Sequence, residues 1–179
     1  MHLINKEARE AKRLEAVHKL KILDTPADDR YDSVTEFASD LLDVPICFIA
    51  ILDSKRQWFK SSVGLTIKES TRDISVCTHA LDAITSRLPE EKLFYVPKLQ
   101  TDERFCDNPF VTGECSARTY ISYVLQSESG ENVGTFCIID TKEREFDQAD
   151  QLKIMMIGTV VENILYGRDY MTGIEGAVH

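Results

Sequence analysis

The stretch Ile46-Cys47-Phe48-Ile49-Ala50-Ile51-Leu52 decides the fold, because every residue in it is apolar. A near-continuous apolar run of this length is typical of a β-strand that is covered on both faces. A polar turn at residues 53–56 and a segment of mixed polarity at 57–65 follow directly, and together they predict a β-hairpin. The sheet therefore starts with an antiparallel pair whose first strand is buried.

The segments before this hairpin predict two helices. Apolar residues recur about every third position between residues 7 and 22, at Ala8, Ala11, Leu14 and Val17. This spacing is typical of an amphipathic helix, which is expected to start near residue 5. Thr25 followed by Pro26 predicts the capped start of a second helix, which runs to about Leu42. Its expected buried side chains are Tyr31, Val34, Phe37, Ala38 and Leu41.

The segments after the hairpin predict a second hairpin, shorter elements and a closing helix. We expect a short helix after Ser75, a strand at 93–96, paired strands at 118–125 and 132–140, and a helix at about 147–170. Residues 66–74 and 98–117 are expected to be loops, and 171–179 a disordered tail. Hairpin-linked strands give a largely antiparallel sheet with helices packed on it, so the predicted fold is α+β, in one domain over residues 1–170.

Composition excludes several classes of function. The chain has 179 residues and a net charge of −9, which opposes generic binding of nucleic acid. The basic stretch at residues 1–21 is interpreted as a solvated helix face with charge pairs such as Glu15 with Lys19 and Glu7 with Lys12. No apolar run is long enough to span a bilayer, and the N-terminus lacks the pattern of a signal peptide. We therefore expect a cytoplasmic protein with no membrane partner.

The five cysteines are scattered and include no Cys-x-x-Cys pair, which argues against a disulfide framework and against a zinc finger. Cys47 and Cys137 lie inside apolar runs and are expected to be core thiols, whereas Cys77, Cys106 and Cys115 lie among polar residues. Phosphate-binding glycine loops and the common hydrolase and calcium motifs are absent from the sequence.

Cys77 and His79 stand close together near the start of a predicted helix. The positive end of a helix dipole lowers the pKa of a thiol, which would favour chemistry at Cys77. Two residues further along, however, His79 faces another side of the helix, so the two side chains form a poor catalytic pair. A metal site would need ligands from the 98–117 loop. We therefore assign no catalytic residue and no metal, and expect both side chains to line a pocket.

Two strands contain further candidate residues. Trp58 alternates with Phe59, so the pair lies on opposite faces of its strand; Phe59 is expected in the core and Trp58 beside a partly open site. On the second hairpin, Arg118, Tyr120 and Ser122 share one face, which meets either solvent or a cavity.

Five stretches, read together and in order, resemble the GAF domain family, in particular the bacterial type that precedes diguanylate cyclase or histidine kinase modules or occurs alone. They span roughly Glu7 to Gly167 and are Leu20-Lys21-Ile22-Leu23-Asp24-Thr25-Pro26, Gln57-Trp58-Phe59-Lys60, Ser75-Val76-Cys77-Thr78-His79-Ala80, Asp102-Glu103-Arg104-Phe105-Cys106-Asp107-Asn108-Pro109 and Gly134-Thr135-Phe136-Cys137-Ile138-Ile139-Asp140. The resemblance implies a PAS-like fold, with a central antiparallel sheet of five to six strands, N- and C-terminal helices on one face, and a loop-covered pocket on the other.

Carried over by position, the resemblance implies a ligand-binding pocket whose border is formed by Trp58, Cys77, His79, Asp102, Phe105, Arg118, Tyr120 and Cys137. Members that attach a bilin use a Cys directly followed by His, whereas Thr78 intervenes here. The Asn-Lys-x-x-x-Phe-Asp-Glu pattern of cyclic-nucleotide members is not evident either. The resemblance therefore predicts a pocket without naming a cofactor.

The function that the resemblance favours is that of a stand-alone sensor. It would bind an unidentified small molecule, form a homodimer through its terminal helices and pass the signal to a partner protein. Two alternatives belong to other classes. One is a cysteine-dependent enzyme related to free methionine-(R)-sulfoxide reductase, and the other is a dimerisation module that binds no ligand.

Overall fold

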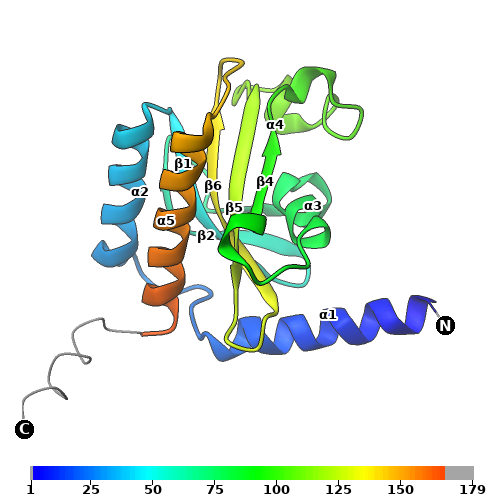
Figure 1. Ribbon diagram of the computed structural model, residues 1–179. Helices are drawn as coiled ribbons and strands as arrows, with labels where there is room; N and C mark the ends of the chain where they lie inside the picture. The colour runs from blue at the N-terminus through cyan, green and yellow to red at the C-terminus, as the bar shows by residue number, and fades with distance from the viewer. Residues whose placement is uncertain (1, 168–179) are drawn as a thin grey trace, which may run out of the picture.

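A computed structural model describes residues 2–167 and contains a six-stranded antiparallel sheet in the order β3-β2-β1-β6-β5-β4 (Figure 1). The strands are β1 (Ile46–Leu52), β2 (Arg56–Val63), β3 (Glu69–Thr71), β4 (Leu93–Val96), β5 (Thr119–Gln126) and β6 (Asn132–Asp140). β1 and β6 pair at the centre, and every residue of β1 is buried, as its apolar run predicts. The predicted antiparallel α+β fold is confirmed.

The helices divide into two layers and one element outside both. α2 (Asp29–Leu42) and α5 (Gln148–Leu165) cover one face of the sheet, and the short α3 (Val76–Ala83) and α4 (Pro109–Thr112) lie with loops on the other (Figure 1). α1 (His2–Lys19) crosses the end of the sheet instead of lying along the face that α5 covers. Between residues 2 and 167, no helix has the length and hydrophobicity needed to cross a bilayer.

Most predicted boundaries agree with the structure, and the exceptions are local. Residues 66–74 include the three-residue edge strand β3, which lacks enough residues to give a visible period. α2 begins at Asp29 instead of Thr25. The Thr25 hydroxyl donates to the carbonyl of Ile22 and accepts from Lys60 Nζ, while the Asp28 carboxylate caps the helix by accepting from the amide of Arg30. The tail predicted for 171–179 lies outside the described residues.

The buried face of α1 agrees only in part with the predicted stripe of Ala8, Ala11, Leu14 and Val17. Ala8 and Ala11 are exposed, and the side chains that face the domain are those of Arg13 and Val17, with Glu10 half-buried. Arg13 is only 7% exposed, and its Nη1 donates to the carbonyl of Leu52 at 2.7 Å. An arginine is a poor core residue by composition, but here the end of β1 supplies a carbonyl that satisfies it.

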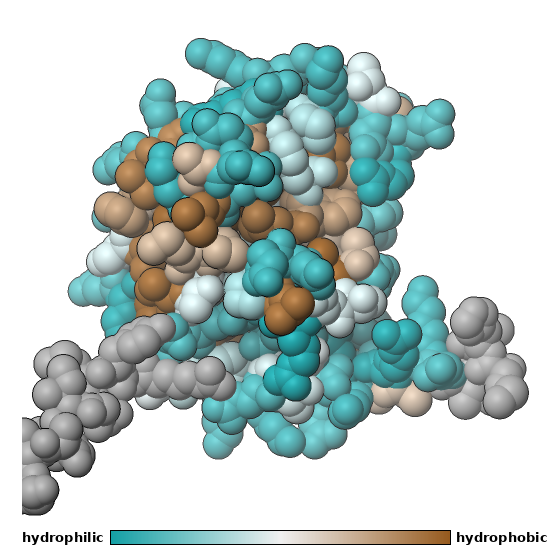
Figure 2. All heavy atoms as spheres, viewed as in Figure 1, coloured by the Kyte–Doolittle hydropathy of each residue, from teal (hydrophilic) through white to brown (hydrophobic). Residues whose placement is uncertain are grey.

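The buried face of α2 is also rotated from the prediction. Tyr31 and Ala38 are buried as expected, but Phe37 is 58% exposed and Leu41 is 43% exposed. Both belong to a second apolar stripe on the helix, because their spacing of four residues puts them on one side. Together with exposed residues of α5 they form what we call the α2–α5 patch: Phe37, Leu41, Leu152, Met156 and Val160. Figure 2 shows apolar side chains gathered over these two helices.

The sheet separates two hydrophobic cores. The α2–α5 core includes Ile49, Tyr123 and Phe136, and the α3–α4 core includes Phe48, Phe105 and Tyr120. α5 lies close to the sheet at Gly158, where an added Cβ would come within 2.3 Å of the Tyr123 ring.

A buried ion pair joins the far end of α5 to the sheet. Lys92, which is 3% exposed, pairs with Glu162 of α5, and the same carboxylate oxygen accepts from the amide of Gln126 at 2.8 Å. The last turns of α5 are thereby linked to the start of β4 and the end of β5.

Candidate functional site

The candidate site lies between α3 and the sheet. Ser75 caps α3 by accepting from the amide of Thr78, and its hydroxyl donates to Oε1 of the buried Gln57 on β2 at 2.8 Å. The side chain of Asn108, at the start of α4, donates to the carbonyl of Ile74 at 2.8 Å. These bonds hold the first turn of α3 over the sheet, so that Cys77 points into the α3–α4 core.

Cys77 meets two other predicted site residues beneath α3. All three side chains, those of Cys77, Tyr120 and Cys137, are at most 1% exposed. The Tyr120 hydroxyl donates to Cys77 Sγ at 3.2 Å. Burial acts to raise the pKa of the Cys77 thiol, but hydrogen bonding, from Cys137 first, outweighs burial and lowers that pKa below its ordinary value. Burial raises the pKa of Cys137 and that of Tyr120 well above their ordinary values.

Two hydroxyl groups lie beside these side chains without a hydrogen bond of ordinary geometry, although Thr135 is near enough to Cys77, and Ser122 to Tyr120, to lower the pKa of each neighbour. Ser122 pairs across the strands with Cys137, and Thr135 precedes Cys137 by two residues on β6, so both share its face of the sheet. Both residues are 0% exposed. Within residues 2–167, neither hydroxyl has a hydrogen-bond partner of ordinary geometry. We call Cys77, Tyr120, Ser122, Thr135 and Cys137 the α3 cluster.

A second group of predicted residues lies on the outer side of α3. The exposed His79 ring packs edge-on against the Phe105 ring, with centroids 4.8 Å apart. The guanidinium of Arg104 lies over the Phe105 ring, with its Cζ 4.8 Å from the ring centroid, and forms an ion pair with Asp102 at 2.6 Å. Hydrogen bonds from Arg104 hold the pKa of Asp102 below its ordinary value. His79 and Asp102 therefore lie on the outer side of α3, and the buried Phe105 ring connects them to the core that contains the α3 cluster.

Arg118 makes local structural contacts. Its Nη1 donates to the carbonyls of Val111 and Ala117, both at 3.0 Å. These bonds fix the segment that connects α4 to β5. The structure therefore places Arg118 next to the predicted site, with Nη1 of its guanidinium already bonded to backbone carbonyls.

The placement of Trp58 corrects the sequence analysis. Trp58 is 8% exposed and belongs to the α2–α5 core, on the opposite face of the sheet from the α3 cluster. Trp58 on β2 pairs with Ile51 on β1, and residues that pair across antiparallel strands point to the same face of the sheet. Since Ile51 belongs to the α2–α5 core, Trp58 does too. Phe59 faces the α3 side instead and packs edge-on against Phe48 at 4.9 Å.

Sequence reasoning missed Thr135 as a site residue and left the role of Ser122 open. The alternation of side chains along a strand was the available signal, because Thr135 has the parity of Cys137 and Ser122 that of Tyr120. Cys106 and Cys115 lie outside the α3 cluster, on the loop between β4 and β5, and partial burial raises the pKa of Cys115. No group of three metal-ligating side chains occurs in the part of the chain that the structure describes.

An antiparallel sheet with long helices on one face and a short helix over a buried polar cluster on the other is the architecture of a PAS-like domain. Residues 26–165 match the GAF domain family, and the chain belongs to that family. Helix α1 lies outside the matched residues.

Similarity to known proteins agrees with this assignment. The chain is 35% identical over 128 residues to a cyclic di-GMP phosphodiesterase of Pseudomonas aeruginosa, a match that covers 72% of this chain and 21% of the phosphodiesterase. The chain thus spans about a fifth of that protein. GAF domains act generally as sensory or regulatory modules in signalling, and this coarse role holds for the chain.

Solved structures with low sequence identity share the fold. The GAF domain of an Acinetobacter phosphoenolpyruvate-protein phosphotransferase superimposes with a TM-score of 0.61 at 13% identity, covering 87% of this chain and 94% of that one. A free methionine-R-sulfoxide reductase from Neisseria meningitidis, solved with its substrate, gives a TM-score of 0.60 at 14% identity, covering 87% and 89%. These two likenesses concern the fold alone.

Proposed function

We propose that this chain is a cytoplasmic GAF sensor that binds a small, uncharged polar molecule at the α3 cluster. The observation that supports this proposal is the pair of buried hydroxyls, Ser122 Oγ and Thr135 Oγ1, neither of which makes a hydrogen bond of ordinary geometry within residues 2–167. A buried polar group left without a partner costs about 1–3 kcal/mol. Natural proteins seldom retain such groups without a role, and a ligand that bonds to both hydroxyls would remove the cost.

The chemistry of the α3 cluster selects the class of ligand. Its side chains are hydroxyls and thiols, and all of them are neutral in their ordinary forms. A charged ligand would lose its hydration there without meeting an opposite charge, which is unfavourable. The proposed ligand is therefore neutral, with hydrogen-bonding groups spaced to reach Ser122 and Thr135.

Entry of the ligand requires α3 to move, because Cys77 and Tyr120 are buried beneath it. α3 has only eight residues, and its first turn is held by the Ser75–Gln57 and Asn108–Ile74 bonds. A short 3₁₀ turn, Arg72–Ile74, precedes it directly, and Arg72 pairs with Glu10 of α1 at 2.6 Å. Movement of α3 would thus reach α1, which supports a relay from the site to the N-terminal helix and on to a partner protein.

The sensor proposal can be tested with substitutions that remove the two hydroxyls. Native mass spectrometry and thermal-shift screening of neutral polar metabolites should identify a ligand whose affinity falls about tenfold in the Ser122→Ala and Thr135→Val variants. Thr35→Val is the matched control, because its hydroxyl is equally buried but lies on α2, under the opposite face. A bare polypeptide mass in repeated preparations, with no thermal shift from any compound, would contradict ligand sensing.

An enzymatic alternative is favoured by the setting of Cys77, whose Sγ accepts from the Tyr120 hydroxyl at 3.2 Å and whose pKa is lowered by hydrogen bonding. A thiolate is the reactive form of cysteine, and reduction of free methionine-(R)-sulfoxide is the reaction to assay. That function predicts activity that is lost in Cys77→Ser and kept in Cys47→Ser, a buried thiol in the other core. Absence of activity in the unmodified chain excludes it.

We also propose that the chain forms a homodimer through the α2–α5 patch. The sequence predicted a dimer contact that includes α1, but Val17 of α1 is completely buried within its own protomer. We therefore propose that the contact is formed by α2 and α5, which have exposed apolar side chains. A two-fold axis beside the two helices would bury the same residues on each copy, as in most homodimers. Light scattering should detect dimers that dissociate in Met156→Asp, whereas the exposed Glu36→Lys on α2 serves as a charge control.

A further inference from the structure

A recess lies at the other end of α3, away from the α3 cluster. This groove has a volume of about 810 Å³ and lies between α1 and the C-terminal half of α3, with the β5–β6 turn closing one side. We call it the α1–α3 groove. Because α1 lies outside the residues that match the family, one wall of the groove is supplied by a segment that the family match does not include.

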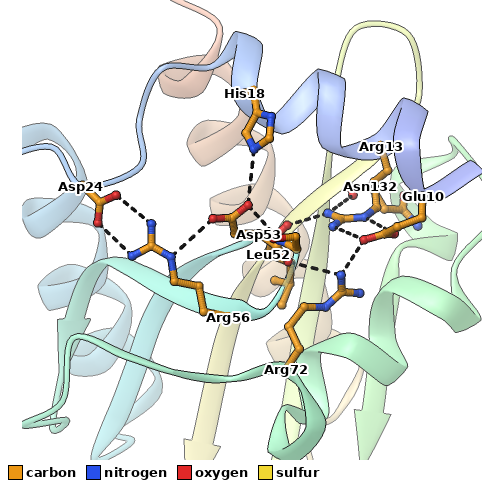
Figure 3. A network of polar contacts seen from close by, with 10 residues as sticks. Glu10, Arg13, His18, Asp24, Leu52, Asp53, Arg56, Arg72 and Asn132 are labelled. Carbon is orange, nitrogen blue, oxygen red and sulfur yellow. Dashed lines mark hydrogen bonds and ion pairs between the residues drawn. The ribbon is translucent and has the colours of Figure 1, made fainter. Parts of the chain in front are cut away.

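Two arginines, Arg13 and Arg72, line the floor of this groove and share one carboxylate. Arg13 Nε and Nη2 donate to the two carboxylate oxygens of Glu10, each at 2.8 Å, and Arg72 Nη1 donates to the same carboxylate at 2.6 Å (Figure 3). Nη1 of Arg13 is also fixed by the Leu52 carbonyl, and Nη1 of Arg72 by the Asp53 carbonyl at 3.2 Å. We call Glu10, Arg13 and Arg72 the Glu10 clasp. It holds both guanidinium groups in place before any ligand arrives.

The positive charge in the groove exceeds what its own acids neutralise. Glu10 is shared between two arginines, and Glu131 pairs with Lys12 at 3.1 Å. Lys6 and Arg9 line the α1 wall, and within residues 2–167 neither has an ion-pair partner. A local cationic surface in a chain with a net charge of −9 is the part of the molecule to which an anion is attracted.

The α3 wall has the opposite character. Asp82 lines it without an ion-pair partner in the described residues, and the hydroxyl-bearing Thr85 lies beside it. The groove therefore presents cations on one side and an acceptor carboxylate on the other. We propose that the α1–α3 groove binds a small organic anion, with its carboxylate or phosphate held by Arg9 and Lys6 over the Glu10 clasp and an amine at its other end held by Asp82.

Such a ligand would contact α1 and α3 together. Along residues 5–12, α1 contributes no fully buried side chain, and Glu10 and Lys12 form ion pairs with Arg72 and Glu131 of the domain. A molecule bridging the two walls would add contacts along the part of α1 that has no fully buried side chain. The groove shares no residue with the α3 cluster, so this proposal is argued separately from the proposed sensor ligand.

The test is a titration of the full chain, followed by amide NMR shifts, with inorganic phosphate, succinate and phosphoethanolamine as probes. We expect saturable shifts at Thr78–Thr85 and Glu131–Asn132, with phosphoethanolamine binding more tightly than inorganic phosphate. Of the two probes without an amine, phosphate and succinate, the one that binds more tightly identifies whether the groove prefers a phosphate or a carboxylate. Arg9→Gln should weaken binding about tenfold, whereas Lys19→Gln, the same charge change on the same helix, should leave it unaltered.

The Asp82→Asn variant isolates the second wall. It should abolish the advantage of phosphoethanolamine over inorganic phosphate and leave phosphate binding itself unchanged or slightly stronger. Shifts that grow without saturation, shifts on another surface, or equal weakening by Arg9→Gln and Lys19→Gln would each overturn the proposal. Thermal unfolding of each variant, compared with the unmodified chain, verifies that a lost signal reflects lost binding.

Discussion

The two faces of the sheet differ in the side chains that they present and in the elements that cover them. Under α2 and α5 the sheet presents an apolar layer, sealed by two long helices that contact it along most of their length. Under α3 and α4 the same strands present thiols and hydroxyls among aromatic rings, beneath an eight-residue helix, a four-residue helix and loops. The first arrangement stabilises the domain, and the second leaves buried polar groups that a ligand can use.

Neighbouring residues on β6 make this comparison sharp. Phe136 points to the α2–α5 core, and Thr135 and Cys137 point to the α3 cluster, although all three are completely buried. Because the three residues are neighbours on one strand, differences in stability between their substitutions reflect the two faces of the sheet and not different strands.

The largest effect is expected from Phe136→Ala. Loss of the ring leaves a cavity in the α2–α5 core and should lower the free energy of unfolding by about 3–5 kcal/mol. Urea unfolding measures this change. Cys137→Ala, one residue away, removes a much smaller side chain from the other face and should cost less. A larger loss from Cys137→Ala would show that the α3 side holds the domain together.

The next effect has the opposite sign. Thr135→Val keeps the shape of the side chain and removes a buried hydroxyl without a partner, so it should raise the free energy of unfolding by about 1–3 kcal/mol. Thr35→Val removes a buried hydroxyl that is bonded to Ser61 at 2.8 Å and should be destabilising. Equal losses in both variants would mean that Thr135 has a partner in solution.

A pH-dependent effect is expected at the end of the sheet. Partial burial acts to raise the pKa of Glu10, but its bonds to Arg13 and Arg72 outweigh burial and lower that pKa from 4.5 to about 2. Because the folded state holds the lower pKa, Glu10 stabilises the protein fully above about pH 4.5 and loses this contribution as the pH falls towards 2. Glu10→Gln should flatten the pH dependence of stability in this range, whereas Glu7→Gln should not.

The smallest effect on the protomer is expected at the α2–α5 patch. Phe37 is more exposed than buried, so Phe37→Ser should change the free energy of unfolding by no more than about 0.5 kcal/mol at low protein concentration. In the proposed dimer the same variant should weaken association, which sedimentation velocity measures. A strongly destabilised monomer would show that Phe37 packs within its own chain.

The sequence was sufficient for the elements and insufficient for their orientation. The apolar run of β1, the second hairpin and the start of α3 at Ser75 follow from local patterns and agree with the structure. Alternation placed Trp58 and Phe59 on opposite faces, but only pairing with β1 decides which face each one takes. For the same reason the face of Tyr120 and Ser122 stayed open until the helices were in place.

The sequence also could not predict which polar side chains are hydrogen-bonded to backbone groups far away in the chain. Arg13 is buried because the carbonyl of Leu52 meets it, 39 residues along the chain, and no local period contains that contact. Arg118 has the residue type of a ligand-binding side chain, yet its Nη1 donates to two nearby carbonyls. The unpartnered hydroxyls of Ser122 and Thr135 likewise become visible only once all neighbouring groups have been placed.

The pair of Lys92 and Glu162 has a consequence for how relatives of this chain diverge. Removal of one partner from a buried ion pair costs about 3–5 kcal/mol, whereas replacing both with apolar residues is often neutral. If Glu162 were replaced alone, Lys92 would remain as an unpaired charge that is 3% exposed. The amide of Gln126 would also lose its hydrogen-bond acceptor. Evolution is therefore expected to change the two positions jointly, and an alignment of close relatives should show them as a covarying pair.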